Sequence, residues 1–406
     1  MMVLNKLKKL GPGLLFAGAA IGVSHLVQST RAGADYGWGL LWALLLVNLF
    51  KYPFFQFGPR YALATGESLL DGYYKLGKNY LWIFFFLNFT TMFTIQTAVT
   101  VVTAGLASNL FQINTDIVYW CIGVTAVCYT ILLIGRYQLL DKVIKIIILM
   151  LTISSVLAVM IAFLKEGKSI DLTPVFPEGA GFLFLIAFMG WMPAPMDISI
   201  WHSIWILEKK NDLKNNLSLK DGLFDFNVGY ITTVFLGICF LGLGALVMFG
   251  SDLEFSNQGN VFAGQLIDLY TSNLGDAAHG IIAVAALTTM FSTTITTLDA
   301  SPRAMSKTIQ LLFQKPQKDY YLTWISLLAA GTCLIFLLLL SEMGLLVQIA
   351  TVLSFITAPF YAILNYRLIT SKHVPKKDQP SVKIKILSIL GIIFLSGFTL
   401  VYLLSL

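Results

Sequence analysis

The chain has 406 residues, of which 57% are hydrophobic and only 12% are charged. Soluble domains carry about 25% charged residues, so this composition excludes an ordinary soluble enzyme or binding domain. The formal net charge of +6 alone would suit a nucleic-acid-binding protein, but the basic residues lie in short loops between apolar stretches and form no single basic patch.

Apolar segments recur along the whole length, and each is long enough to cross about 30 Å of hydrocarbon. We predict spans near residues 12–32, 38–62, 80–108, 117–135, 143–164, 180–206, 226–250, 277–302, 321–340, 344–367 and 384–405. The segments between them are too short to form a soluble domain. The sequence therefore predicts an all-α integral membrane protein of about 11 transmembrane helices, with a single transmembrane domain over residues 1–406.

The basic residues alternate between the two sides of this arrangement. With the N-terminus inside, 23 of the 27 lysines and arginines fall on the cytoplasmic side. Arg31, Lys165 and Lys168 fall outside, and Lys51 lies within a span. Cytoplasmic loops carry an excess of basic residues. We therefore expect a multi-pass protein of the cell (inner) membrane with a cytoplasmic N-terminus, and no role in binding nucleic acid.

The first span is interrupted halfway along its length. Its apolar residues run to Ile21 and are followed by Gly22, Val23, Ser24 and His25, and then by a polar stretch. Glycine gives the backbone conformational freedom that weakens a helix interior. The pattern predicts a break in the helix at this point.

The second span contains a charged residue, Lys51, about nine residues before Arg60 at the cytoplasmic end. A rise of ~1.5 Å per residue places Lys51 about 13 Å from that end, near the middle of the membrane. Ionisable residues in spans are energetically costly and usually functional. One interpretation is that Lys51 replaces a bound cation and pairs with Asp197 or with a substrate carboxylate. The other is a lysine that snorkels toward the interface.

The sixth span is interrupted in the same way as the first. Its apolar residues run to Met189 and are followed by the sequence GWMPAPMDIS. Pro193 and Pro195 cannot both lie in an intact helix, because each lacks an N–H group and clashes with the preceding turn.

Interrupted helices at matching places, five spans apart, are the best sequence indication of a transporter binding site. Backbone without hydrogen-bond partners is tolerated at membrane depth only where it is buried in protein or lines a cavity. Two ordinary kinked helices would explain either break alone but not their coincidence. We predict a secondary transporter with a first repeat at about 12–164, a second repeat at about 180–367 and an extra helix at about 384–405.

Polar groups near the breaks are the candidate substrate ligands. They are the free carbonyls of Gly22 and Trp191, the side chains of Ser24, His25, Lys51, Met192, Asp197 and Ser199, and a hydroxyl-rich face of the eighth span with Thr289, Ser292 and Thr293. Hydroxyls in helices also bond to carbonyls of their own helix, which is the structural alternative for this face. An imidazole and a thioether would suit a soft transition metal, so His25 and Met192, with Asp197 supplying charge, form a candidate metal site.

Several segments resemble the Nramp family of divalent-metal transporters. They include GPGLLFAGAAIG and STRAGADYGWGLLW at the first span, RYALATGESL after the second, MFSTTITTLDA in the eighth and VLSFITAPF in the tenth. The resemblance covers nearly all of the chain. It implies the LeuT-type fold, in which two inverted five-helix repeats are followed by an extra helix, helices 1 and 6 are discontinuous, and substrate binds at their unwound points.

The same resemblance shows where the chain departs from the family. Aligned on Ala32-Gly33-Ala34, the family's Asp-Pro-Gly-Asn metal motif falls on Gly22-Val23-Ser24-His25, so glycine replaces the metal-binding aspartate. The family's Met-Pro-His motif in helix 6 falls either on Met192-Pro193-Ala194 or on Pro195-Met196-Asp197. The acidic residues of helix 3 and the arginine of helix 9 that the family uses in its proton route are also absent.

Three functions are compatible with these residues. The first is an Nramp-like carrier that moves a divalent metal cation by alternating access. The second is a carrier of a small organic solute, such as an amino acid or an amine, on the same fold. The third is a non-transporting membrane sensor, which has no need to keep costly broken helices.

We do not expect an enzyme, because the sequence offers no nucleophile–base pair, histidine cluster or phosphate-binding loop. We expect no cofactor apart from a divalent metal ion bound as substrate. The expected partners are the lipid bilayer and a small ionic or polar substrate, with no obligatory protein partner.

Overall fold

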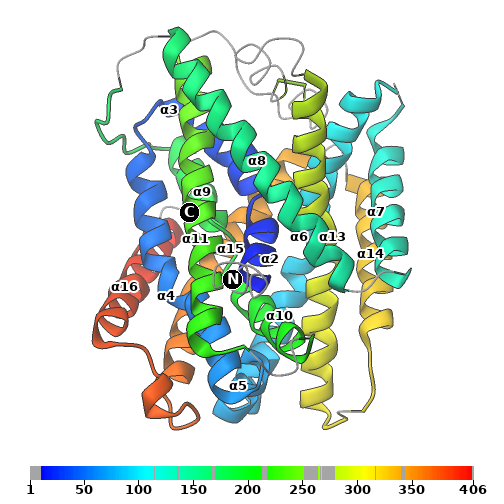
Figure 1. The fold of residues 1–406 in the computed structure, drawn as a ribbon, viewed down its shortest axis with the longest axis vertical. Coiled ribbons are helices and arrows are strands. Elements are labelled where there is room, and N and C mark those ends of the chain that lie inside the picture. The colour runs from blue at the N-terminus through cyan, green and yellow to red at the C-terminus, as the bar shows by residue number, and fades with distance from the viewer. Residues whose placement is uncertain are drawn as a thin grey trace, which may run out of the picture.

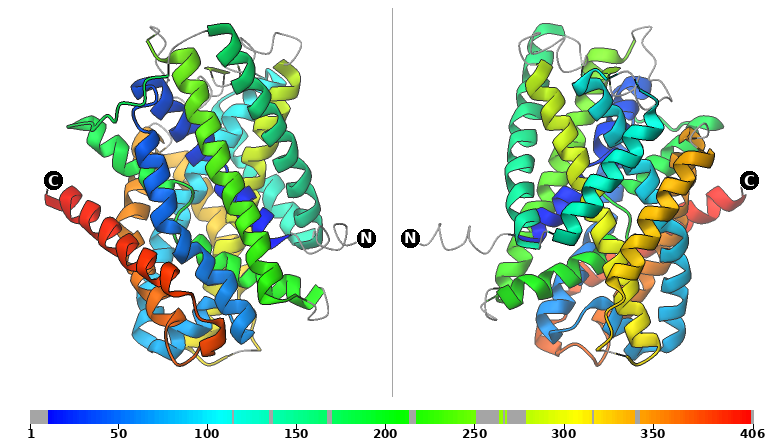
Figure 2. Two further views of the ribbon diagram at one scale, coloured as in Figure 1. Left: turned by 60° about the vertical axis from the view of Figure 1, so that its left-hand side comes forward. Right: turned by 90° about the vertical axis from the view of Figure 1, so that its right-hand side faces the viewer.

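The computed structural model describes residues 11–113, 115–134, 137–166, 170–212, 217–250, 264–265, 267, 279–315, 317–339 and 343–404. Within these residues the chain is helical and contains no strand. Most of the long helices run side by side along the longest axis of one bundle (Figures 1 and 2). Lys168, assigned above to the outer side, lies outside the described residues.

Eleven helical segments coincide with the eleven predicted spans. They are α2, η1 and α3 (Pro12–Ala20, Ser24–Ser29, Thr30–Tyr36), α4 (Leu41–Thr65), α6 (Lys78–Phe111), α7 (Ile117–Ile134), α8 (Tyr137–Glu166), α9 with α10 (Ala180–Trp191, Ile198–Asp212), α11 with η2 (Leu219–Leu243, Gly244–Met248), α13 (His279–Leu312), α14 (Tyr321–Leu339), α15 (Met343–Ile369) and α16 (Val382–Leu404). The all-α membrane fold is therefore confirmed, and the first and sixth spans are each divided into two helices.

Length and hydropathy alone detect fewer spans. Six of the described helices are long and apolar enough to cross a membrane, or seven if the bent pair formed by residues 12–36 is one span. The helices that escape this test have a structural reason to do so. α4 contains Lys51 and two prolines, and the break shortens α9 to 12 residues.

A short helix that we did not predict, α5 (Leu69–Leu76), follows α4. Ser68 caps its N-terminus, and Asp71 completes a capping box with it. The sequence does carry the signal, since a serine three residues before an acidic residue marks a helix start. α5 packs at one end of the bundle, where Asp71 forms an ion pair with Lys307 of α13 at 2.9 Å. α13 reaches that ion pair because it continues to Leu312, ten residues beyond the predicted end of its span.

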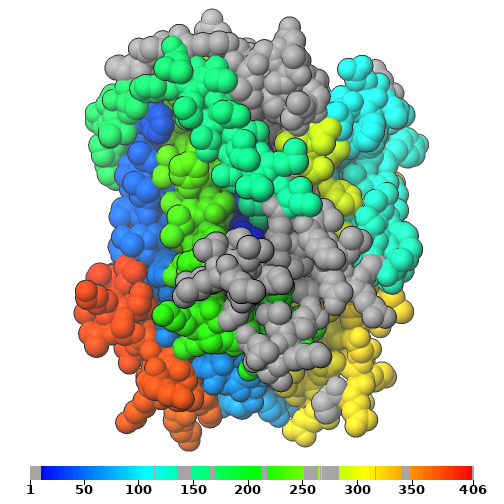
Figure 3. All heavy atoms as spheres, in the orientation of Figure 1, coloured from blue at the N-terminus to red at the C-terminus, as the bar shows by residue number. Residues whose placement is uncertain are grey.

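The first helix lies in the interior of the bundle. Leu15, Phe16 and Ala17 of α2 are fully buried. In Figure 3 only a small patch of dark-blue atoms marks this helix, deep between the atoms of its neighbours. α16, by contrast, lies at the outer edge and leans away from the bundle in both views of Figure 2. The break in the first helix is therefore surrounded by protein, as unpaired backbone at membrane depth requires.

α11 holds the N-terminal half of the broken first helix, α2, by direct backbone contact. A Cβ atom on Gly229 would lie 1.9 Å from the carbonyl oxygen of Gly13, and one on Gly13 would lie 2.1 Å from that of Asp225. The Asp225 carboxylate accepts hydrogen bonds from the amides of Gly11 and Gly13, at 3.0 and 2.7 Å. These amides belong to the first turn of α2, where a helix has no partners of its own.

The C-terminal half of the first helix, formed by η1 and α3, is held in the same way at the other end of α11. A Cβ atom on Gly33 would lie 2.0 Å from the carbonyl oxygen of Leu241, and one on Gly244 would lie 2.0 Å from that of Thr30. Small residues let membrane helices approach this closely. Dispersion contacts between the backbones then stabilise the helix pair, because the hydrophobic effect does not drive helices together within lipid. α11 with η2 is therefore a continuous support along both halves of the first helix.

This contact makes the effect of a single methyl group predictable. We expect Gly229→Ala to lower the stability by about 1–3 kcal/mol, because the added methyl overlaps the Gly13 carbonyl. Gly123→Ala in α7 is the control, because a Cβ there meets nothing within 4 Å. It should gain about 0.5–1 kcal/mol from higher helix propensity. Thermal unfolding of the purified protein measures both, and equal changes in the two variants would contradict the backbone contact.

Candidate functional site

The first helix breaks at Ile21 and Gly22, between α2 and η1. The two parts of the helix are bent by 50°. Carbonyls released by the break bond to hydroxyls of α13 instead of to amides of their own helix. Thr293 Oγ1 lies 3.1 Å from the carbonyl oxygens of both Gly18 and Ile21, and Ser292 Oγ donates to the Gly18 carbonyl at 3.2 Å.

Gly22 has no room for a side chain. A Cβ atom there would lie 2.8 Å from Thr293 Oγ1 and 2.9 Å from Thr293 Cγ2. Gly22 is the position at which the resemblance places the family's metal-binding aspartate. In this chain the side chain of Thr293 fills the space into which that aspartate would extend, so Gly22 and Thr293 form one packing arrangement.

The sixth span breaks between Trp191, the last residue of α9, and Ile198, the first of α10. Met192 is extended, and the peptide bond to Pro193 is cis. The carbonyls of this segment converge on one ammonium group. Lys51 Nζ donates its three N–H groups to the carbonyl oxygens of Met189 at 2.8 Å, Gly190 at 2.7 Å and Met192 at 3.1 Å, and the carbonyl oxygen of Ala194 lies 3.4 Å from the same nitrogen.

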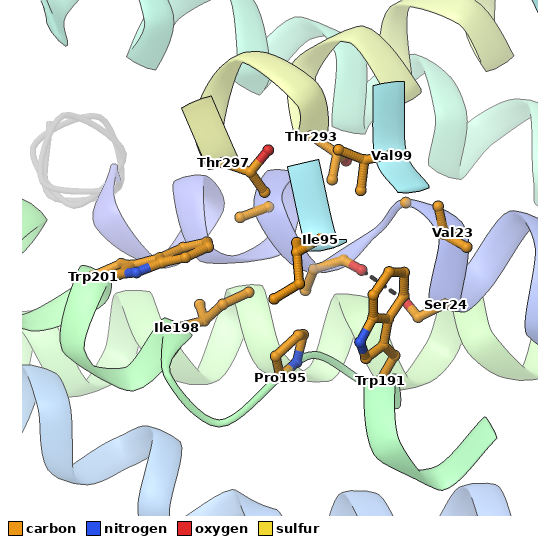
Figure 4. Close-up of a pocket in the computed structure, with 13 residues that line it drawn as sticks. Val23, Ser24, Ile95, Val99, Trp191, Pro195, Ile198, Trp201, Thr293 and Thr297 are labelled. Atoms are coloured by element: carbon orange, nitrogen blue, oxygen red, sulfur yellow. Dashed lines mark hydrogen bonds between the residues drawn. The ribbon is translucent and has the colours of Figure 1, made fainter. Parts of the chain in front are cut away.

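A cavity lies between the two breaks (Figure 4). The space open to the centre of a water molecule is ≈ 20 Å³, about what one or two ordered waters require. Its lining comes from the first helix (Ala19, Ala20, Gly22, Val23, Ser24), from α6 (Ile95, Val99), from the sixth span (Trp191, Pro195, Ile198, Trp201) and from α13 (Thr293, Thr297). None of these side chains is a carboxylate, an imidazole, a thiol or a thioether.

Four of the residues singled out from the sequence line this cavity, namely Gly22, Ser24, Trp191 and Thr293. Ser24 Oγ lies 2.8 Å from the Ala20 carbonyl and 3.3 Å from the Pro193 carbonyl. Its hydroxyl thus contacts backbone on both sides of the cavity and connects the two breaks.

His25 and Met192 lie outside the cavity. His25 Nε2 lies 3.0 Å from the Thr233 carbonyl oxygen, and it must be the donor because a carbonyl can only accept. The other ring nitrogen, Nδ1, lies 2.7 Å from Ser24 Oγ. A Cβ atom on Gly237 of α11 would lie 3.5 Å from Met192 Sδ and 3.7 Å from His25 Cδ2. Both side chains therefore face α11.

Asp197 and Ser199 are also buried away from the cavity lining. α10 begins at Ile198 and presents Ile198 and Trp201, which lie one turn apart on one face, to the cavity. Asp197 precedes the helix, and its Oδ1 has no hydrogen-bond partner. Ser199 Oγ donates to the Met196 carbonyl at 2.7 Å and accepts from Asn365 Nδ2 at 3.1 Å.

None of the three residues of the expected metal site, His25, Met192 and Asp197, lines the cavity, and the site itself stays a prediction. The two possible alignments of helix 6 placed Met192 or Asp197 toward the substrate, and neither residue lines the cavity. In the part of the chain that the structure describes, no group of three or more His, Cys, Asp or Glu residues is placed to hold a metal ion.

The hydroxyl groups of α13 differ in what they contact: some bond only within their own helix, and others contact the first helix or line the cavity. Thr289 bonds only to the Ala285 carbonyl of its own helix, at 2.7 Å, and does not reach the cavity. Ser292 does not line the cavity but binds the Gly18 carbonyl that the break of the first helix leaves without an amide partner. Thr297, one turn beyond Thr293, lines the cavity and donates to Gln96 Oε1 at 2.7 Å. Its spacing of four residues from Thr293 is the signal that would have included it.

The structure excludes the snorkelling interpretation of Lys51 and its pairing with Asp197, whereas the replacement of a bound cation stays open. Its side chain is fully buried, so it does not snorkel toward an interface. Its polar contacts are the four carbonyls of the sixth span, and none of the ion pairs found among the described residues involves it. It also does not line the cavity.

Comparison with known sequences gives one family. Residues 13–405 match the family model described as natural resistance-associated macrophage protein-like, or Nramp. An uncharacterized protein of Pasteurella multocida (strain Pm70) is 39% identical over 407 residues, which cover 98% of this chain and 92% of that relative.

Comparison with solved structures gives the fold. A manganese transporter of Eremococcus coleocola, in a single-substitution variant, aligns with a TM-score of 0.74 at 13% identity and covers 97% of this chain and 85% of that one. Mhp1, a nucleobase-cation-symport-1 family transporter, aligns at 0.61 with 12% identity (97% and 92% covered), and MhsT in complex with L-phenylalanine at 0.62 with 13% (97% and 98%). These likenesses show the LeuT-type fold.

The packing of Gly22 against Thr293 can be tested by a double-mutant cycle. Gly22→Asp should lower the stability by about 1–3 kcal/mol, because Thr293 occupies the space. In the Thr293→Ala background the cost should be smaller, with a coupling of about 0.5–3 kcal/mol. Thermal unfolding provides the readout.

The matched control is the same cycle with Thr289→Ala, because Thr289 bonds only to its own helix. Gly22→Asp and Thr289→Ala should be additive to within about 0.5 kcal/mol. Additivity in both cycles would contradict the assignment of Thr293 as the group that replaces a side chain at position 22.

Proposed function

Because this chain belongs to the Nramp family, we propose that it is a secondary transporter that moves a divalent cation across the membrane by alternating access. The observation that carries this proposal is the meeting of two broken helices at one cavity in a chain whose residues 13–405 match that family. Broken helices of this kind form the substrate sites of transporters with internal repeats. The family is one of transporters and not of enzymes.

Family membership also favours a cation over the other two functions considered. The structurally similar Eremococcus coleocola protein is described as a manganese transporter, which supports a divalent metal as cargo. A small organic solute has no comparable support from the family. A sensor without transport would leave the two broken helices and the cavity between them without a purpose.

The lining of the cavity indicates which cations fit. Among its side chains, the only groups that can accept a cation are the hydroxyl oxygens of Ser24, Thr293 and Thr297, because the indole N–H groups of Trp191 and Trp201 can only donate. Oxygen ligands suit hard cations such as Mg²⁺, Ca²⁺ and Mn²⁺, whereas sulfur and imidazole nitrogen suit softer metals. Neutral oxygens cannot replace a full hydration shell, and Mg²⁺ in particular loses water reluctantly. We infer that the cargo is a hard divalent cation that keeps part of its water.

The charge distribution supports an inner-membrane protein with a cytoplasmic N-terminus. The segments between α4 and α6, between α13 and α14 and between α15 and α16 lie at one end of the bundle, at the bottom of Figure 1, and α3 lies at the other end. These segments and the helix ends beside them carry Arg60, Lys75, Lys78, Arg303, Lys307, Lys315, Lys318, Arg367, Lys372, Lys376, Lys377, Lys383 and Lys385, whereas α3 carries Arg31. Such an excess is typical of the cytoplasmic side.

Uptake of Mn²⁺ and Mg²⁺ into proteoliposomes tests the proposal. We expect saturable uptake, in which each ion competes with the other. Ser24→Ala should reduce the uptake by about 2- to 10-fold, as expected for the loss of one hydrogen-bonding group worth about 0.5–1.4 kcal/mol. Ser388→Ala is the matched control. Both serines are buried and bond to a carbonyl four residues earlier, but Ser388 lies in α16, away from the cavity.

Three results would count against the proposal. Absence of uptake for Mg²⁺, Ca²⁺ and Mn²⁺ in reconstituted, folded protein would exclude a divalent cation as cargo. A preference for the soft ion Cd²⁺ over Mn²⁺ would contradict the oxygen-only lining. Equal uptake by Ser24→Ala and Ser388→Ala would exclude the cavity between the breaks as the transport site.

A further inference from the structure

The ammonium group of Lys51 is bound as a free cation would be. All four acceptors are backbone carbonyl oxygens, and all belong to the six-residue stretch from Met189 to Ala194. Two of the contacts, to Met189 and Gly190, are shorter than 2.9 Å. Converging carbonyl oxygens are the groups with which proteins replace the hydration shell of monovalent cations.

The carbonyls need a positive charge at this place. The last carbonyls of a helix have no amide partners within it and carry the negative end of the helix dipole. Here the helix α9 ends inside the bundle, and Gly190 and Met192 flank its last residue, Trp191. Unpaired carbonyls at membrane depth cost several kcal/mol each. A single cation placed among them removes most of that cost.

The position of Lys51 is fixed by close packing of α4. A Cβ atom on Gly58, two turns beyond Lys51, would lie 2.2 Å from the carbonyl oxygen of Ser199 in α10. In the segment itself, a Cβ atom on Gly190 would lie 2.3 Å from the carbonyl oxygen of Thr351 in α15. The segment is therefore packed closely against α15 and is bound by the lysine of α4, a helix that packs closely against α10.

We propose that Lys51 is a tethered cation that permanently occupies a monovalent-cation site in the break of the sixth span. The site consists of the carbonyls of Met189, Gly190, Met192 and Ala194. The tether keeps the segment unwound without any bound ion, so the wild-type protein requires neither Na⁺ nor K⁺ at this break. Removal of the side chain exposes a site that a free alkali-metal or alkylammonium ion fills.

This inference is independent of the cargo. The tethered ammonium does not line the cavity between the breaks, and its role is to stabilise a backbone conformation. The test therefore measures folding stability and not transport. A failure of the proposed transport activity would leave the inference intact, and a failure of the inference would leave the transport proposal intact.

Two substitutions of different size distinguish the effect of removing the positive charge from the effect of leaving an empty space. Lys51→Ala removes the ammonium and leaves room for an ion, whereas Lys51→Met removes the ammonium but keeps an apolar chain in the site. We expect both to lower the thermal unfolding temperature in choline chloride. Addition of Na⁺, K⁺ or propylammonium at constant ionic strength should raise the unfolding temperature of Lys51→Ala by several degrees in a saturable manner, because a ligand that binds only the folded state stabilises it.

The same additions should leave Lys51→Met and the wild type unchanged, because neither has an empty site. The proposal is overturned if Lys51→Ala does not respond to any of the three cations, or if Lys51→Met responds equally. Propylammonium is the most specific probe, since it supplies the severed part of the lysine side chain.

Should Lys51→Ala not accumulate as folded protein, Lys51→Gln provides the test. Its amide can donate to two of the carbonyls, occupies the space and carries no charge. We expect Lys51→Gln to be less stable than the wild type and insensitive to all three cations. Stability equal to that of the wild type would show that the segment needs hydrogen bonds but no cation, and would overturn the proposal.

Discussion

Unpaired carbonyls at two helix breaks inside the membrane are the constraint on which the rest of this structure depends. The cavity between the breaks has room for only one or two water molecules, so other groups of the protein must satisfy most of these carbonyls. In the first helix, the hydroxyls of Ser292 and Thr293 do so from α13. In the sixth span, the ammonium of Lys51 does so from α4. These contacts explain why α4 and α13 lie beside the breaks.

The same contacts explain how the chain keeps the family's fold without the family's metal motif. Gly22 and Thr293 occupy together the space in which an aspartate at position 22 would extend. Substitution of Gly22 by aspartate alone would therefore place the new side chain against Thr293. At the position where the resemblance places an aspartate, this chain has Gly22, and the hydroxyls of Ser292 and Thr293 bind the carbonyls of the break.

The sequence was sufficient for those features that a long or unusual pattern determines. Eleven apolar stretches define the helices, and Gly22, Pro193 and Pro195 mark the breaks. The partners of Lys51 could not be predicted, because backbone carbonyls have no sequence signature. The apolar lining residues Ile198 and Trp201 were missed for a related reason. The rotation of a helix after a break depends on where it restarts, and a shift by one residue turns each side chain by about 100°. The division into two repeats remains a prediction.

The carbonyls bound by Lys51 also bear on how a cation is recognised. Once the ammonium occupies the oxygens of Gly190 and Met192, the helix-6 break cannot offer them to the cargo. The cavity then supplies hydroxyl oxygens and no negative charge, which is too little to strip a divalent ion of its water. Selection must therefore act on the ion with part of its hydration shell, through the size of the opened cavity and through hydrogen bonds to coordinated water. We therefore expect the break of the sixth span to be a structural element, and the hydroxyls of Ser24, Thr293 and Thr297, which line the cavity, to carry the recognition.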